Sequence, residues 1–354
     1  MIINSPGTLK TLMKKIFFLL AFFLFSISFN TSYAYKVGLL MPTQNETRWY
    51  NDGFVLEQKM KNAGFQAELF FAGDADVALQ QRQIARVINE GCNALVIGSI
   101  DGAALTEVLK EAKQKNIKVI SYDRLITGTD AVSYYATFDN AKVGELQGRF
   151  LIGRLKPYAS DDVKYIELFY GSIDDNNARY FFNGAMKYLQ PHLDSGKFVI
   201  RSKQIDPKVI QTPAWSTQEA AKRMSSLIEQ YNYRPSGERL DAVLAPADCI
   251  ALGIVSALKR EGFTDSNMPV ITGQDASPEG LELVKSGALG MTILKNPDDL
   301  SSVVVEMVEA IAEGKEPLIN DTTTYDNGVY VVPSYLCEPK IVTKKNMKDL
   351  IKNL

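Results

Sequence analysis

The sequence has 354 residues, of which 46% are hydrophobic and 23% charged, as in ordinary soluble globular proteins. This composition excludes a disordered or fibrous chain. Lysine and arginine total 39 against 41 aspartate and glutamate, a formal net charge of −2. That balance argues against a nucleic-acid partner, because proteins that bind nucleic acids present a basic surface. The chain is longer than one hydrophobic core usually organises, so two domains are expected.

The first 34 residues have the pattern of a cleavable secretory signal peptide. Lys14 and Lys15 precede an apolar run over residues 16–29, and small residues at Ser32 and Ala34 fit cleavage after Ala34. The apolar run is shorter than the roughly 20 residues that span a bilayer, which disfavours the alternative of an uncleaved membrane anchor. We therefore expect an exported protein, periplasmic if the source has two membranes.

From residue 35 onward, β-branched or aromatic runs alternate with amphipathic stretches, the pattern of βαβ units around parallel sheets. In the first half, strands are predicted at 35–41, 66–71, 94–98, 118–122 and 133–137, and helices at 49–62, 78–90 and 105–115. The pattern then restarts, with strands predicted at 164–169, 198–202, 241–245, 270–272 and 290–294 and helices at 178–189, 217–231, 250–260 and 279–286. A helix at 298–313 and short strands at 330–332 and 339–342 follow. Two doubly wound halves joined by a short hinge are expected.

The sequence motifs of most metal and nucleophilic catalytic centres are absent. The one histidine, His192, is expected on the surface at a helix end. Cys92, Cys249 and Cys337 are too far apart for a disulfide framework or a metal cluster and are expected to be small buried hydrophobic residues. No cofactor and no metal are expected.

Polar side chains follow the predicted strands at the edge where ligands bind to parallel sheets. They include Arg48, Trp49, Asp123, Arg124, Asp175, Asn177, Asp248, Asp275 and Lys295. The second tryptophan of the chain, Trp215, also lies in such a loop. Indole faces pack on the C–H faces of a sugar ring, and carboxylate, amide and guanidinium groups match its hydroxyl rim. The pattern favours a sugar pocket over the alternative of helix caps and local ion pairs.

Five stretches, residues 93–98, 117–124, 138–147, 171–178 and 273–276, closely resemble the periplasmic monosaccharide-binding proteins of ABC importers. The resemblance covers residues 35–345 and is nearest to the xylose-binding and multiple-sugar-binding members. It implies an α/β fold of the type I periplasmic-binding-protein class, with two doubly wound αβα domains joined by a three-segment hinge. The implied domains are 35–139 plus 296–325 and 140–295 plus 326–354, with crossings near Asp139, Asn296 and Tyr325.

The resemblance also implies that the nine polar-loop residues named above clasp a sugar together with Trp215. The two domains would close around one pyranose, with Trp49 and Trp215 packing on its faces. Ala247 stands where the xylose-binding relatives carry an amide side chain, so the choice among xylose, galactose, arabinose and glucose stays open.

The implied partners are a monosaccharide and the membrane permease of an ABC transporter, with the protein itself a monomer and not an enzyme. A sugar-sensing role through a chemoreceptor or sensor kinase is the alternative. An enzyme such as a glycosidase, using a carboxylate pair like Asp175 and Asp275, is a further alternative.

Overall fold

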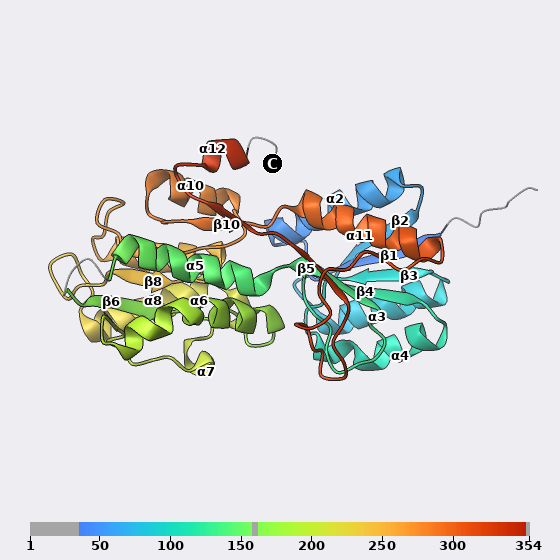
Figure 1. Ribbon diagram of the computed structural model, residues 1–354, viewed down its shortest axis with the longest axis horizontal. Coiled ribbons are helices and arrows are strands. Elements are labelled where there is room, and N and C mark those ends of the chain that lie inside the picture. The colour runs from blue at the N-terminus through green and yellow to red at the C-terminus, as the bar shows by residue number, and fades with distance from the viewer. Residues whose placement is uncertain (1–34, 158–161, 352–354) are drawn as a thin grey trace, which may run out of the picture. The chain divides into compact units, whose positions relative to one another are not determined.

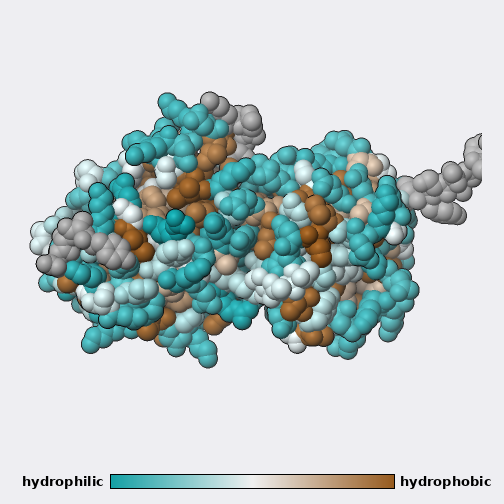
Figure 2. Space-filling model, viewed as in Figure 1, coloured by the Kyte–Doolittle hydropathy of each residue, from teal (hydrophilic) through white to brown (hydrophobic). Residues whose placement is uncertain are grey.

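The computed structural model describes residues 35–157 and 162–351. The predicted signal peptide, residues 1–34 with cleavage after Ala34, therefore lies outside the described residues. From Lys36 onward the chain forms one compact unit. Within the described ranges, no helix is both long enough and apolar enough to cross a membrane. On the face drawn in Figure 2, hydrophilic residues predominate and interrupt the hydrophobic ones.

A six-stranded parallel sheet of order β11-β5-β4-β3-β1-β2 organises what we term the first lobe. Its strands are β1 (Lys36–Met41), β2 (Gln66–Phe71), β3 (Ala94–Ile97), β4 (Lys118–Tyr122), β5 (Tyr134–Phe138) and β11 (Ser334–Cys337). Its helices are α2 (Thr47–Asn62), α3 (Val77–Asn89), the short 3-10 helix η1 (Ala103–Leu105), α4 (Thr106–Gln114) and α11 (Pro297–Ala312). α2 packs against α11 on one face of the sheet and α3 against α4 on the other (Figure 1). Central strands such as β3 are buried on both faces, which explains their continuous apolar sequence.

A four-stranded parallel sheet of order β7-β6-β8-β9 organises the second lobe. Its strands are β6 (Lys164–Leu168), β7 (Phe198–Val199), β8 (Ala242–Leu244) and β9 (Val270–Ile271). Its helices are α5 (Asn140–Leu155), α6 (Asn176–Asp194), α7 (Pro207–Ile210), the 3-10 helix η2 (Pro213–Trp215), α8 (Thr217–Tyr231), α9 (Asp248–Arg260) and α10 (Pro278–Ser286). An antiparallel pair, β10 (Thr292–Leu294) with β12 (Lys340–Val342), and the terminal turn α12 (Met347–Leu350) complete the structure. Parallel strands with helices on both sides in each lobe confirm the predicted type I periplasmic-binding-protein fold.

Helix α5 was not expected from the sequence, and its glycines explain why. Gly144 and Gly148 lower the helix propensity of this stretch, yet they let its backbone lie directly on α6 (Figure 1). A methyl group on Gly144 would lie 1.9 Å from the carbonyl oxygen of Phe181, and one on Gly184 would lie 2.2 Å from the carbonyl oxygen of Ala141. Both distances are too short for any side chain, so each helix approaches the other through its glycines.

The chain passes between the lobes three times. It leaves the first lobe between β5 and α5 at Asp139, returns between β10 and α11 at Asn296, and leaves again between β11 and β12. The third crossing therefore follows Cys337, and the expectation of a crossing near Tyr325 is wrong. Residues 326–337, which were assigned to the second domain, belong to the first lobe.

The turn before β11 shows why this segment stays in the first lobe. The backbone N–H of Gly128 donates to the carbonyl oxygen of Asn327 at 2.7 Å, and the Asn327 amide donates to the carbonyl oxygen of Thr129 at 2.8 Å. The predicted strand at 330–332 does not form, because the Asn327 side chain instead accepts from the N–H groups of residues 329 and 330. The strand lies a few residues later, where Ser334–Cys337 pairs with β5.

His192 is buried and not at the surface as expected. It is 4% exposed, its ring centroid lies 5.0 Å from that of Phe198, and burial lowers its pKa. Cys92 and Cys337 are buried and Cys249 is partly buried, all three as free thiols.

Candidate functional site

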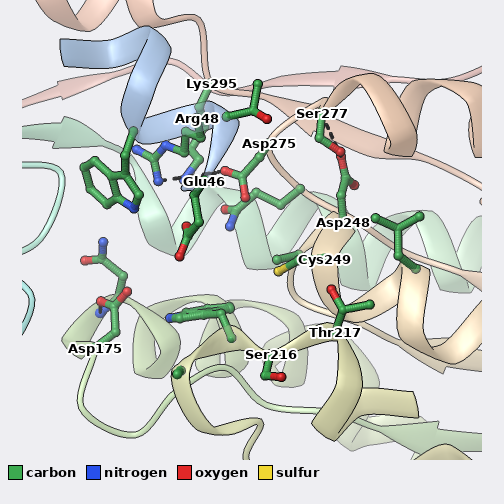
Figure 3. Close-up of a pocket in the computed structure, with 18 of the residues that line it drawn as sticks. Glu46, Arg48, Asp175, Ser216, Thr217, Asp248, Cys249, Asp275, Ser277 and Lys295 are labelled. Atoms are coloured by element: carbon green, nitrogen blue, oxygen red, sulfur yellow. Dashed lines mark hydrogen bonds and ion pairs between the residues drawn. The ribbon is translucent and has the colours of Figure 1, made fainter. Parts of the chain in front are cut away.

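Loops at the carboxyl ends of the strands of both lobes line one cavity of about 410 Å³. All ten residues predicted from the sequence line it: Arg48, Trp49, Asp123, Arg124, Asp175, Asn177, Trp215, Asp248, Asp275 and Lys295. Because each parallel strand ends at the same edge of its sheet, residues far apart in the sequence meet here (Figure 3). Their contacts with a ligand stay a prediction. Their contacts with the rest of the protein differ from one residue to the next, which the sequence did not reveal.

Arg48 and Lys295 form a cationic cluster with two carboxylates. The Arg48 guanidinium donates to Asp123 and lies 3.9 Å from Oδ1 of Asp275, while Nζ of Lys295 lies 2.9 Å from the same Asp275 oxygen (Figure 3). Burial alone would raise the pKa of Asp123, but Arg48 and Lys295 outweigh it and hold that pKa well below its usual range. The side chains of the cluster therefore stay ionised, and their positive and negative charges neutralise one another.

Asp123 is also fixed through its backbone. It has a left-handed φ of +59°, which aspartate tolerates better than most residues. Its carbonyl oxygen accepts hydrogen bonds from the Tyr135 hydroxyl at 2.5 Å, the Thr137 hydroxyl at 3.0 Å and the Asn177 amide at 2.8 Å. The carboxylate of Asp123 is thus held at the cavity by three donors behind it.

Arg124 pairs across the cavity with the second lobe. Its Nε lies 3.1 Å from Oδ2 of Asp175, the N-cap of α6. Asn177, two residues after this N-cap in the first turn of α6, is held within the protein, because its amide nitrogen donates to the Asp123 carbonyl and its oxygen accepts from Tyr135 at 3.1 Å and from Asn140 at 3.0 Å. Asn177 therefore links the two lobes.

The Trp49 ring is more buried than expected for a ring that packs on a sugar. It is only 1% exposed, and the guanidinium carbons of Arg48 and Arg124 lie 4.6 and 5.0 Å from its ring centroid. Such contacts are cation–π interactions that orient the two arginines. The ring therefore supports Arg48 and Arg124 and has little exposed surface, while its stacking on a sugar stays a prediction.

Trp215 presents more of its ring, from an irregular segment. Both Ala214 and Trp215 have positive φ angles, 51° and 56°. The indole ring lies against Gly171, where a methyl group would come within 2.1 Å of it, and 6.3 Å from the ring of Phe181. Its Nε1 is buried with no hydrogen-bond partner among the described residues.

Asp248 does not present free carboxylate oxygens to the cavity. Its Oδ1 accepts from the Thr292 hydroxyl at 2.7 Å, and its Oδ2 accepts from the N–H of Ser277 at 2.9 Å and from the Ser277 hydroxyl at 3.2 Å (Figure 3). Burial and the negative charge of Asp275 raise its pKa to about 7. Asp248 therefore holds the loop that carries Asp275. The position of Asp248 after a strand could not show whether the residue positions this loop or binds a ligand.

Several lining residues were not among the ten predicted from the sequence, although Glu46 and Gln274 lie in the same polar loops. They include Glu46, Phe181, Ser216, Thr217, Gln274 and Glu279. Phe181 lies four residues after Asn177 on one face of α6, and that spacing was a usable signal. Across the described ranges, no group of histidine, cysteine or acidic side chains is arranged to hold a metal ion.

Comparison with known proteins assigns the chain to a family. The family model described as "Periplasmic binding protein domain" matches residues 37–316. The chain belongs to this family of periplasmic binding proteins. The resemblance predicted from the sequence motifs is thereby confirmed.

Three curated relatives of this binding protein cover most of the chain. The multiple sugar-binding periplasmic protein SbpA of Azospirillum brasilense is 42% identical over 317 residues, covering 89% of this chain and 87% of the relative. The multiple sugar-binding periplasmic receptor ChvE of Rhizobium radiobacter is also 42% identical over 317 residues, covering 89% and 88%. The D-xylose-binding periplasmic protein of Escherichia coli is 35% identical over 318 residues, covering 89% of each.

A solved structure agrees closely with the fold of this binding protein. It is an ABC transporter solute binding protein from Clostridium phytofermentans with bound β-D-glucose. The two chains share 43% identity with a TM-score of 0.85, and the match covers 89% of this chain and 96% of the other.

Proposed function

We propose that this chain is a solute-binding protein that captures a monosaccharide in the cavity and delivers it to the membrane permease of an ABC importer. The observation that carries the proposal is the pairing of charges in the cavity. Arg48, Arg124 and Lys295 each face a carboxylate, which leaves no unneutralised cation for an anionic ligand. Paired groups of this kind still donate and accept hydrogen bonds, which suits the hydroxyls of a neutral sugar beside the Trp215 ring.

Capture would work by closure of the two lobes, here defined as 35–139 plus 296–337 and 140–295 plus the residues after 337. A ligand drives closure only to the extent that it binds the closed form more tightly. Ion pairs between lobes, such as Arg124 with Asp175, supply sites where one hydroxyl group contacts both lobes at once. The permease would recognise the closed form.

Location and ligand follow from the relatives. Their names describe periplasmic proteins, which supports export of this chain to the periplasm. Cleavage of the signal peptide after Ala34 and a monomeric state are parts of the proposal that these names do not address. Relatives named for multiple sugars, together with a glucose-bound structure, support a pyranose of the glucose, galactose, arabinose or xylose type. Ala247 favours the multiple-sugar type over strict xylose preference.

Calorimetric titration of ligand-stripped protein against those sugars tests the proposal. We expect micromolar or tighter binding of at least one sugar, and at least 100-fold weaker binding in Asp275→Ala and in Arg124→Ala. The first removes the nearer of the two carboxylate partners of buried Lys295, and the second leaves the buried Asp175 carboxylate unpaired. Arg86→Ala is the matched control, since Arg86 forms an exposed ion pair with Glu90 far from the cavity. Full affinity in both cavity variants contradicts the site, and no binding of any sugar by the wild-type protein contradicts the function.

A sensory role is the second candidate, favoured by the word receptor in the name of one relative. The closed form would then dock on a chemoreceptor or sensor kinase. Deleting the permease separates the two roles, because sugar-dependent signalling persists only if a receptor reads the protein directly. The proposal assigns no enzymatic activity, and sugar turnover by the purified protein would contradict it.

A further inference from the structure

Gln274 lies in the loop after β9 and lines the cavity, but sequence analysis did not assign it to the site. The side chain is 2% exposed. Its backbone carbonyl oxygen accepts from the N–H of Asp248 at 2.9 Å, and the N–H of Asp275 donates to the carbonyl oxygen of Ile293 at 2.8 Å. The loop is thus fixed on both sides of Gln274, and the side chain has a defined place at the cavity.

The Gln274 side chain carries a buried polar atom that the protein does not satisfy. Oε1 has no hydrogen-bond partner among the described residues. Buried side-chain amides are nearly always hydrogen-bonded, since leaving one unpaired is costly. The Asn177 amide at the same cavity shows the usual state, because its oxygen accepts from Tyr135 and Asn140 and its nitrogen donates to the Asp123 carbonyl. A ligand in the cavity can supply the partner that Gln274 lacks.

The neighbouring loop does not supply that partner. It is joined to Gln274 through the Asp248 backbone and contributes Ala247 to the cavity wall, whose methyl group forms no hydrogen bond. The amide of Gln274 is also a neutral acceptor, whereas the carboxylates of Asp123, Asp175 and Asp275 are shared with cations. A neutral hydroxyl group suits such an acceptor.

We propose that Gln274 is a specificity-determining residue whose side-chain carbonyl accepts a hydrogen bond from one hydroxyl group of the bound sugar. The inference rests on the proposed function of the cavity as a sugar site. It adds a contact outside the ten predicted residues. It also predicts that the protein distinguishes a sugar from the analogue that lacks this one hydroxyl group.

Calorimetric titration with the tightest-binding sugar and each of its monodeoxy analogues tests the assignment. We expect Gln274→Met, which keeps the volume and removes the amide, to bind the parent sugar about 3- to 10-fold more weakly. One deoxy analogue should bind the wild-type protein more weakly than the parent sugar does and should lose that penalty in the variant. Penalties at the other positions should persist.

Gln190→Met is the matched control, because Gln190 is exposed on α6 outside the cavity and its amide donates to Asp194 at 2.7 Å. It should keep wild-type affinity and the full set of deoxy penalties. Gln274→Asn, which withdraws the carbonyl by one methylene, should behave like Gln274→Met and replaces it if that variant does not fold.

Unchanged deoxy penalties in the Gln274 variants overturn the assignment while leaving the sugar site intact. Failure of the wild-type protein to bind any sugar overturns the proposed function instead. The two failures are therefore distinguishable.

Discussion

Trp215 owes its place at the cavity to a glycine on a neighbouring loop. A methyl group on Gly171 would come within 2.1 Å of the indole ring, so Gly171→Ala must displace the ring. We expect sugar affinity to fall about 3- to 10-fold, the loss of one aromatic contact. Titration calorimetry measures the change. Gly153→Ala, which meets no atom within 4 Å, is the control, and equal affinity in both variants contradicts this role of Gly171.

Asp248 should make stability depend on pH. Burial and Asp275 raise its pKa from 3.8 to about 7, so the folded protein binds this proton more tightly than the unfolded chain does. The contribution of Asp248 to stability is therefore fully present below about pH 4, falls as pH rises through 7 and changes little above about pH 8. Relative to Asp248→Asn, which does not titrate, wild-type unfolding free energy should drop by roughly 2 to 3 kcal/mol between pH 5 and pH 8.

Denaturant unfolding of both proteins across this pH range measures the difference. Other titrating groups, including Asp52 with its pKa raised to about 6 by burial, cancel in the comparison. Parallel pH profiles for the two proteins would show that Asp248 does not titrate in this range.

At the level of elements, the contact between α5 and α6 depends on particular glycines. Gly144→Ala places a methyl group 1.9 Å from a backbone oxygen of α6, which only a shift of the helices can relieve. We expect a loss of about 1 to 3 kcal/mol in unfolding free energy, as for overpacked cores. Gly153→Ala on the same helix should instead gain up to about 1 kcal/mol from helix propensity. Chemical denaturation distinguishes the two, and a neutral Gly144→Ala contradicts the close approach.

Local patterning predicted most elements, because parallel strands and amphipathic helices show in short windows. The helix predicted at 217–231 matches α8 at both ends. Helix α5 was missed because its glycines lower helix propensity, and the reason for them, close packing against α6, appears only in the fold. Strand β11 was predicted too early in the chain because Val329 and Tyr330, which favour strands, bond instead to the Asn327 side chain in a turn.

For the site residues, too, local sequence predicted position but not the contacts made with distant segments. Position after a strand was enough to bring ten residues to one cavity. It did not distinguish Asp248, whose oxygens are used internally, or Trp49, whose ring is covered by two arginines. Such roles depend on contacts between distant segments, which no single window of sequence contains.

For the whole molecule, hydrogen bonds between lobes should contribute to sugar affinity from outside the cavity. The Tyr180 hydroxyl on α6 donates to the carbonyl oxygen of Thr324 in the first lobe at 3.1 Å. Tyr180→Phe should weaken sugar binding about 2- to 5-fold, because the closed form loses one hydrogen bond. Tyr188→Phe on the same helix is the control, since its hydroxyl bonds to Glu145 within the second lobe. Equal affinity of the two variants in calorimetry contradicts the link.

The late position of β11 has a consequence for the order of folding. The second sheet is built wholly from residues 164–271, whereas the first sheet needs β11, which begins at Ser334, to pair with β5, which ends at Phe138. Bringing these strands together closes a loop that contains residues 140–295 of the second lobe, and pairings so distant in the chain form slowly. In refolding, we expect the second lobe to acquire hydrogen-exchange protection first, so that the half that begins the sequence is the last to become native.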